Sequence, residues 1–166
     1  MTIITNWIDR NDTNVRSFNN KYKFNLIYSK SRDGFDCITF HNKCNQKGPF
    51  IVLIKIQSKK IYGGYNPIGY ASRKGEWLTT SDSFIFSFEN GQDTHNMKIG
   101  RVINPNYSIY EKLYVYGLNP YLYLHIARFY NDILDNTNVY LPIEEIEAFS
   151  VIRRCFFNFC FNSQNY

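Results

Sequence analysis

The sequence lacks any apolar run that is long enough to cross a bilayer, so no transmembrane segment is predicted. Its first residues, MTIITNWIDRNDTNV, also lack the apolar core of a secretory signal peptide. We therefore expect a protein of the reducing cytoplasm, where its four cysteines are thiols. Charged residues are few as well, at 20% of the chain, while 44% is hydrophobic. This balance and the length of 166 residues indicate a single globular domain.

The sequence also lacks a long basic cluster. It has 19 Lys and Arg residues against 14 Asp and Glu, a net charge of +5, but the cations are scattered. The longest basic cluster is the pair Lys59–Lys60. Because nucleic-acid-binding domains gather their cations on one face or along one helix, we expect a mildly basic surface rather than a nucleic-acid interface.

Aromatic side chains are abundant, with 14 Tyr and 14 Phe, and they supply material for a large core. They fall in short alternating or continuously apolar runs between turn residues, which is typical of β-strands. The predicted strands are residues 21–28, 49–56, 60–65, 82–88, 111–118, 121–126 and 139–152. The second and third of these form one predicted hairpin, and the fifth and sixth form another. Such strands, without repeated helices between them, indicate a sandwich or a folded antiparallel sheet. The faces expected in the core are Phe84, Phe86 and Phe88 on one strand, and Tyr22, Phe24 and Leu26 on another.

One segment, residues 33–48, has a helical period. Four residues with spacings of three and four share one face of this predicted helix: Cys37, Phe40, His41 and Cys44. Ser31 or Asp33 is the predicted N-cap, and Gly48–Pro49 is the predicted stop. A second, weaker helix is predicted over residues 127–134.

Three residue types that bind metals share the helical face, namely Cys37, His41 and Cys44. A structural zinc site normally takes four ligands, and a fourth is evident here only if Cys155 or Cys160 returns to the helix. The simpler interpretation is that both helical cysteines are small buried hydrophobes, so no metal is predicted. A disulfide between them is excluded in a regular helix, because seven residues rise about 10 Å.

Two further groups have the residue types of functional sites. Glu144, Glu145 and Glu147 could do acid–base chemistry, but no partner base is identifiable, and a charged outer face explains them more simply. The pair Gly63 and Gly64 lacks the motifs of phosphate-binding loops and instead favours a bulge or the close approach of another strand. No catalytic, cofactor-binding or metal-binding residue is therefore predicted.

Several segments, in this order and spacing, resemble the TLDc domain of the oxidation-resistance proteins. They are Leu26–Phe35, Phe40-His41-x2-Cys44, Gly48–Pro49, Ile61–Tyr65, Asp82–Phe88 and Glu144–Phe149. The resemblance is densest from about Ile3 to Phe88, and the residues around Trp7–Asp9 and Tyr65–Pro67 resemble fungal versions. The second half departs from the pattern, because residues 117–124 lack the Phe-Gly turn of the family.

The resemblance implies a mainly β, α+β fold, with a two-sheet antiparallel β-sandwich flanked by short helices. It implies a TLDc-like domain over residues 1–152, followed by an atypical aromatic tail over residues 153–166. It also implies a role in oxidative-stress resistance, without a catalytic centre or a cofactor, through binding to subunits of the vacuolar-type proton ATPase. The candidate interaction or motif residues are Arg32, Asp33, His41, Gly63, Gly64, Tyr65, Asn66, Glu144, Glu145 and Glu147.

Two other functions stay open at this point. One is a thiol-based antioxidant enzyme that uses Cys37 or Cys44, with His41 within one helical turn of both. The other is an adaptor fragment of a protein that joins a BTB-type module to a TLDc domain. The residues alone do not decide between these functions.

Overall fold

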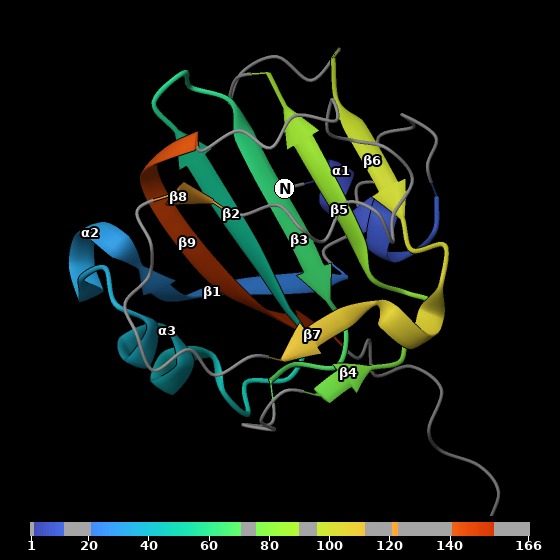
Figure 1. Ribbon diagram of the computed structural model, residues 1–166. Coiled ribbons are helices and arrows are strands. Elements are labelled where there is room, and N and C mark those ends of the chain that lie inside the picture. Colours follow the sequence, from blue (N-terminus) through green and yellow to red (C-terminus); the bar gives the residue numbers. More distant parts are fainter. Residues whose placement is uncertain are drawn as a thin grey trace, which may run out of the picture. The chain divides into compact units, whose positions relative to one another are not determined.

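The computed structural model describes residues 2–11, 21–70, 76–89, 96–111, 121–122 and 141–154. Its elements are α1 (Thr2–Ile8), β1 (Tyr22–Ser29), α2 (Lys30–Asp33), α3 (Cys37–Cys44), β2 (Phe50–Ile56), β3 (Ile61–Asn66), β4 (Glu76–Leu78), β5 (Phe84–Phe88), β6 (Lys98–Arg101), the 3-10 helix η1 (Pro105–Tyr107), β7 (Ile109–Glu111), β8 (Tyr121–Leu122) and β9 (Leu141–Arg153) (Figure 1). The chain divides into two compact units, one of residues 1–23 with 152–166 and one of residues 24–151. No helix of the described ranges is long and apolar enough to span a membrane.

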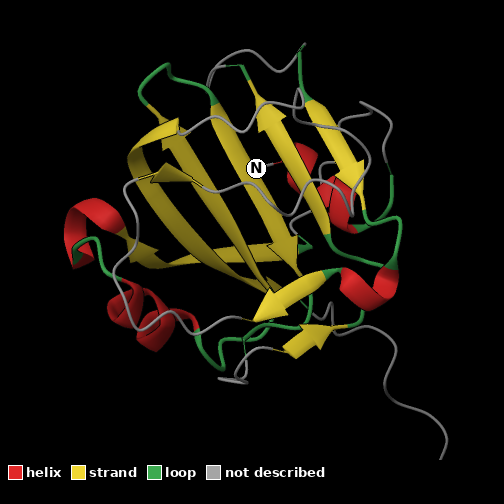
Figure 2. Ribbon diagram, viewed as in Figure 1, coloured by secondary structure: helices red, strands yellow, loops and turns green. Residues whose placement is uncertain are grey.

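Most of the described strands belong to one sheet of seven strands, in the order β1-β9-β2-β3-β5-β6, with β8 paired to β9. The pairings of β2 with β3 and β9, of β5 with β3 and β6, and of β8 with β9 are all antiparallel. A second, two-stranded sheet pairs β4 with β7. The described residues are thus mainly β, with short helices, which confirms that part of the predicted fold (Figure 2). The large second layer of a sandwich is not seen in them.

The strand predicted to be buried on both sides is central in the sheet. β2 lies between β9 and β3, and both Phe50 and Ile51, which point to opposite faces, are buried. One face of the sheet carries a cluster in which Ile146 and Ala148 of β9 pack with Tyr28 and Cys44. This cluster attaches α3 to the sheet.

The aromatic face of β5 is buried as predicted at Phe84 and Phe86, and Phe88 is half-buried. The ring centroids of Phe86 and Phe88 lie 5.4 Å apart. The other predicted core face is wrong at Leu26, which is 41% exposed. Leu26 lies in β1, the edge strand of the sheet, where one side has no neighbouring strand among the described residues.

The predicted single helix over residues 33–48 is wrong in its bounds, because the structure has two helices, α2 and α3, separated at Gly34. Gly34 has a φ of 88°, a conformation outside the right-handed helix that glycine adopts readily. The N-cap of α3 is Asp36, whose carboxylate accepts the Thr39 N–H at 2.8 Å, rather than Ser31 or Asp33.

Other sequence predictions have mixed outcomes. The hairpin of β2 and β3 is confirmed, and the closing strand is confirmed as β9. The described ends of the second predicted hairpin pair elsewhere, because β7 pairs with β4, and β8 pairs with β9. Most of that hairpin, the predicted helix over 127–134 and residues 155–166 lie outside the described residues.

Candidate functional site

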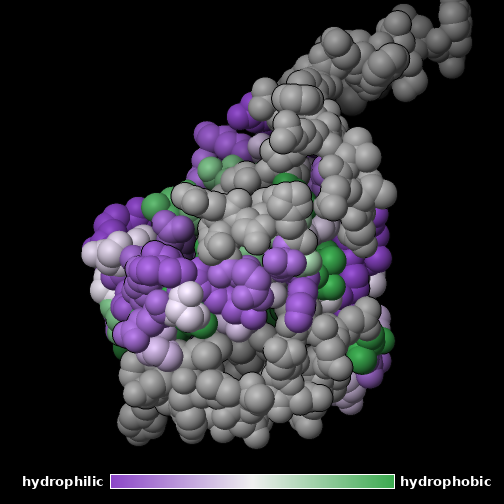
Figure 3. Space-filling model, turned by 90° about the horizontal axis from the view of Figure 1, so that it is seen from above, coloured by the Kyte–Doolittle hydropathy of each residue, from purple (hydrophilic) through white to green (hydrophobic). Residues whose placement is uncertain are grey.

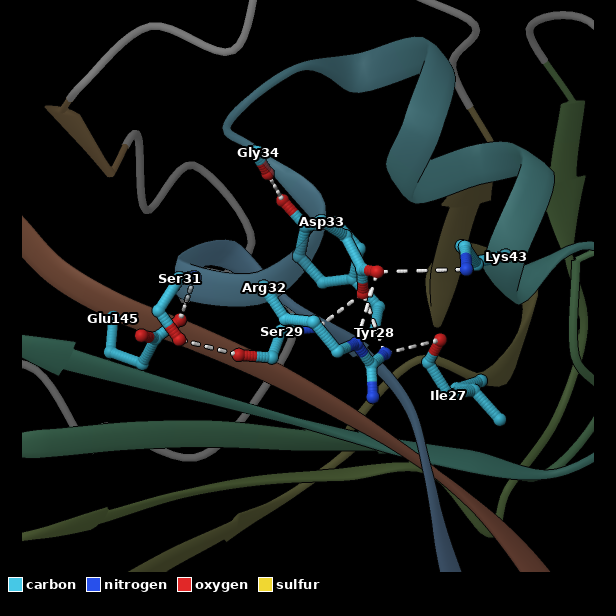
Figure 4. Close-up of polar contacts among 9 residues, drawn as sticks. All are labelled: Ile27, Tyr28, Ser29, Ser31, Arg32, Asp33, Gly34, Lys43 and Glu145. Atoms are coloured by element: carbon cyan, nitrogen blue, oxygen red, sulfur yellow. Dashed lines mark hydrogen bonds and ion pairs between the residues drawn. The ribbon is translucent and has the colours of Figure 1, made fainter.

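The charged turn of α2 is the best-defined polar cluster that the sequence singled out. Arg32 donates two hydrogen bonds to Asp33, from Nε to Oδ1 at 3.0 Å and from Nη2 to Oδ2 at 2.6 Å (Figure 4). Asp33 Oδ2 also accepts the Ser29 N–H at 3.0 Å, and Lys43 Nζ lies 3.5 Å from Oδ1. The hydrogen bonds from Arg32 and then from the Ser29 N–H hold the pKa of Asp33 well below its usual range. Asp33 therefore stays ionised and binds groups from β1, α2 and α3.

The position of this turn is fixed by a buried tyrosine. Tyr28 lies one residue before the end of β1 and is buried in the core, and its hydroxyl donates to the carbonyl of Gly34 at 2.7 Å. Burial raises the pKa of Tyr28 to about 12, so its hydroxyl remains a donor at neutral pH. The Phe40 ring packs edge-on against it, with centroids 5.1 Å apart.

The turn is also tied to the beginning of β9. Lys30 Nζ donates to the carbonyls of Ile143 and Glu144 at 3.0 and 2.9 Å. In return, Glu145 Oε1 accepts the N–H groups of Ser31 at 3.1 Å and Ile146 at 3.0 Å. Burial raises the pKa of Glu145, but these hydrogen bonds outweigh it, and the net shift is downward. The α2 turn and β9 thus satisfy each other's backbone groups.

The three predicted acidic residues of β9 do not form one site. Glu144 binds Lys55 Nζ at 2.7 Å and Lys59 Nζ at 3.2 Å, and the hydrogen bonds from these lysines lower its pKa. Glu145 binds the α2 turn, while Glu147 lies opposite Leu53 in the register of β2 and β9. Seen from above, the described surface is largely hydrophilic (Figure 3). The carboxylates of Glu144 and Glu145 are thus used for ion pairs and backbone contacts.

The helical face of α3 is part of the core. Cys44 is fully buried, and burial raises the pKa of its thiol to about 12. His41 is buried against the Tyr70 ring, with centroids 5.5 Å apart, and its Nδ1 has no hydrogen-bond partner in the described ranges. Within those ranges, no three His, Cys, Asp or Glu side chains could hold a metal ion. The side chain of Cys37, together with Cys155 and Cys160, lies outside the described residues.

The candidate residues of β3 lie inside the sheet. Gly63 and Gly64 stand opposite Leu53 and Val52 of β2. Tyr65 and Asn66 are both buried, and Asn66 Oδ1 accepts the N–H groups of Ile68 and Gly69 at 2.9 Å each. Asn66 thus closes a side-chain-to-backbone turn.

The arrangement of these segments agrees with a comparison against protein families. The family model of the TLDc domain matches residues 4–119, which is more than half of the chain. The chain belongs to the TLDc domain family. The match confirms the resemblance that the motifs indicate, and it includes the α2 turn, α3 and the glycine pair of β3. The TLDc family is generally linked to oxidative-stress resistance, and TLDc domains are protein-interaction modules. A search of curated proteins finds no match to the chain.

The sequence does not predict two contacts of the α2 turn in this TLDc domain. Lys30 binds the beginning of β9, and Lys43 of α3 pairs with Asp33. Opposite charges within the Lys30–Asp33 turn were a weak signal that it holds ion pairs. No sequence signal pairs Lys30 with the carbonyl of Ile143, which lies 113 residues away. Lys43 reaches Asp33 because Gly34 turns the chain between α2 and α3.

Proposed function

We propose that this TLDc domain is a non-catalytic protein-binding module of the cytoplasm. It contributes to oxidative-stress resistance by binding subunits of the vacuolar-type proton ATPase and regulating their assembly. The observation that supports this proposal is the match of residues 4–119 to the TLDc family.

The absence of catalysis is supported by the way the reactive side chains are used. Asp33 of α2 and both Glu144 and Glu145 of β9 are bound to cations or backbone N–H groups. General acid–base catalysis needs a group within reach of a substrate proton, with a pKa near the working pH. The pKa values of these three carboxyls are all shifted downward, away from neutrality.

A thiol-based antioxidant enzyme is less well supported. A reactive thiol needs partial exposure and a lowered pKa, and Cys44 has neither. We expect Cys44 to resist alkylation in the native chain at neutral pH and to react rapidly after unfolding in urea. Mass spectrometry of the labelled peptides measures the extent of alkylation. Fast labelling of Cys44 in the native chain would support the hypothesis of a thiol-based enzyme.

The domain is proposed to extend over residues 1–152, beyond the end of the family match at residue 119. β9 lies between β1 and β2, so the sheet needs this strand to be continuous. Residues 153–166 remain a proposed separate tail. The two-sheet sandwich also remains a proposal, with the pair β4 and β7 as part of its second layer.

The candidate contact residues differ in their access to a partner. Arg32 is exposed, and Glu144 is partly exposed, so both are proposed contacts. His41, Tyr65 and Asn66 are buried and are proposed to act by shaping the surface. Gly63 and Gly64 are proposed to act through their backbone positions. Asp33, Glu145 and Glu147 are proposed to act through the polar contacts of their side chains.

The proposal is tested by adding the purified full chain to the purified proton ATPase. We expect the chain to sediment with the ATPase and to change the fraction of assembled enzyme, measured by gel filtration and by ATP hydrolysis. Failure to associate at micromolar concentrations, with an intact ATPase, would reject this partner. Catalysed peroxide consumption by the chain alone would reject the non-catalytic role.

A further inference from the structure

The outward surface of α2 and α3 carries two cations and an exposed apolar side chain. The side chains of Arg32 and Lys43 are 48% and 49% exposed, and both lie on Asp33. Ile38 of α3 is 65% exposed, and Asn42, one turn further on, is exposed beside it. We call Arg32, Ile38, Asn42 and Lys43 the α3 outer face.

The anions close to this face are turned toward the protein. Asp33 is only 9% exposed, and its oxygens are bound by Arg32, Lys43 and the Ser29 N–H. Asp36 caps α3 by accepting the Thr39 N–H. Glu145 accepts backbone N–H groups of α2 and β9. The charges that project toward solvent from the α3 outer face are therefore positive.

The guanidinium of Arg32 is held in place before any partner arrives. Its Nε and Nη2 bind Asp33, and Nη2 also donates to the carbonyl of Ile27 at 3.3 Å. The remaining terminal nitrogen, Nη1, points away from this cluster and makes no hydrogen bond to the described part of the chain (Figure 4). A fixed donor loses little side-chain entropy when a carboxylate binds to it.

We propose that the α3 outer face binds an acidic protein segment that carries an apolar side chain. A carboxylate of the partner binds Arg32 Nη1, a second lies near Lys43, and the apolar side chain packs on Ile38. This inference rests on the proposed function as a protein-binding domain and names the chemistry of the partner. Two exposed cations are fewer than the four to eight basic residues typical of anionic membrane recognition, and the arginine is of the type enriched in protein interfaces.

The probe is a short fluorescein-labelled peptide composed of Glu and Leu, titrated into the full chain at low salt and followed by anisotropy. Binding is expected to weaken on addition of salt, because the pairs are exposed. A matched peptide of Gln and Leu lacks the charges and is expected to bind at least about tenfold more weakly. Equal binding of the two peptides would overturn the proposal.

Three variants locate the site. Lys43→Glu is expected to weaken binding of the acidic peptide about tenfold, by replacing attraction with repulsion. Ile38→Ser, at an exposed position that the fold does not need, is expected to weaken it about threefold. Lys98→Glu makes the same charge change on exposed Lys98 of β6 and is expected to leave binding unchanged. A loss in Lys98→Glu equal to that in Lys43→Glu would overturn the proposal.

Three further outcomes test this inference separately from the proposed function. If vesicles of anionic lipid bind the α3 outer face more tightly than the peptide does, the partner is a membrane and the inference is wrong. If Lys43→Glu and Ile38→Ser bind the proton ATPase as well as the unaltered chain does, the inference fails and the proposed function stands. If the acidic peptide binds this face but the ATPase does not, the proposed partner fails alone.

Discussion

The α2 turn and the middle of β3 belong to the same unit of the chain, but they are stabilised in opposite ways. In the α2 turn, Lys30, Asp33 and Glu145 bind backbone groups and cations across β1, α3 and β9. In β3, Gly63 contributes by having no side chain, because a Cβ there would overlap the Phe86 ring. The first region depends on charge and the second on close packing, so different perturbations should break them.

The largest effect is expected where packing is tightest. Gly63→Ala places a methyl group against the buried Phe86 ring and should lower the free energy of unfolding by about 1–3 kcal/mol. Gly64→Ala is the matched control, because its nearest neighbour would lie 3.7 Å away, an ordinary contact. Its effect should stay within about 0.5 kcal/mol. Urea unfolding measures both, and equal losses would mean that the overlap with Phe86 is not what makes Gly63 necessary.

A smaller loss is expected where Lys30 joins α2 to β9. Lys30→Met keeps most of the aliphatic stem but removes the donor to the carbonyls of Ile143 and Glu144. We expect a loss of about 1–2 kcal/mol in the free energy of unfolding. Lys23→Met, at an exposed position of β1, is the control and should have little effect. An unaltered midpoint for Lys30→Met in urea would show that solvent satisfies both carbonyls.

Acid should weaken the α2 turn but not the packing of β3. Because the pKa of Asp33 is lowered in the folded chain, its contribution to stability is complete above its ordinary pKa of about 4 and is lost as the pH falls. The unfolding free energy of Asp33→Asn should therefore fall less steeply than that of the unaltered chain between about pH 5 and pH 2. Parallel pH profiles of the two proteins, from urea unfolding, would contradict this role.

The smallest effect is expected at Lys59, in the turn between β2 and β3. Its backbone conformation lowers the stability of the fold, while its ion pair raises it. Lys59 has a φ of 72°, which disfavours a residue with a Cβ, and its exposed side chain pairs with Glu144. Lys59→Gly should raise the free energy of unfolding by about 0.5 kcal/mol, because an exposed ion pair contributes little. Lys59→Ala keeps the strain, loses the pair and should be slightly destabilising. A destabilising Lys59→Gly would show that the ion pair outweighs the strain.

The sequence predicts the parts of the fold that depend on local pattern. The continuous apolar run of β2 and the alternation of β5 mark buried strands because burial repeats with the period of the strand. The glycine pair favours a bulge or the close approach of another strand, and the structure has the second of these at Gly63, where the approaching group is the Phe86 ring of β5. The helix bounds were wrong because the apolar period spans only Cys37 to Cys44, which are the bounds of α3, while the predicted cap and stop residues lie outside this span.

The α2 turn shows what pattern alone does not reveal. Its candidate residue Asp33 pairs with Lys43 of α3, and its neighbours Lys30 and Ser31 bind β9, far along the chain. Such pairings are set by the register of β9 beside β1 and β2, which no local spacing encodes. The sequence likewise gives no sign that Ile38 is exposed, because its exposure depends on which face of α3 packs against the core.

The most direct test of the account is hydrogen–deuterium exchange of the full chain with and without the purified proton ATPase. We predict slower exchange of the backbone amides from Lys30 to Cys44 in the complex, with β6 unchanged. Lys43→Glu should reduce this protection. Association of the ATPase without protection of this segment, or with protection confined to β6, would contradict the claim that the α2 turn and α3 form the contact surface.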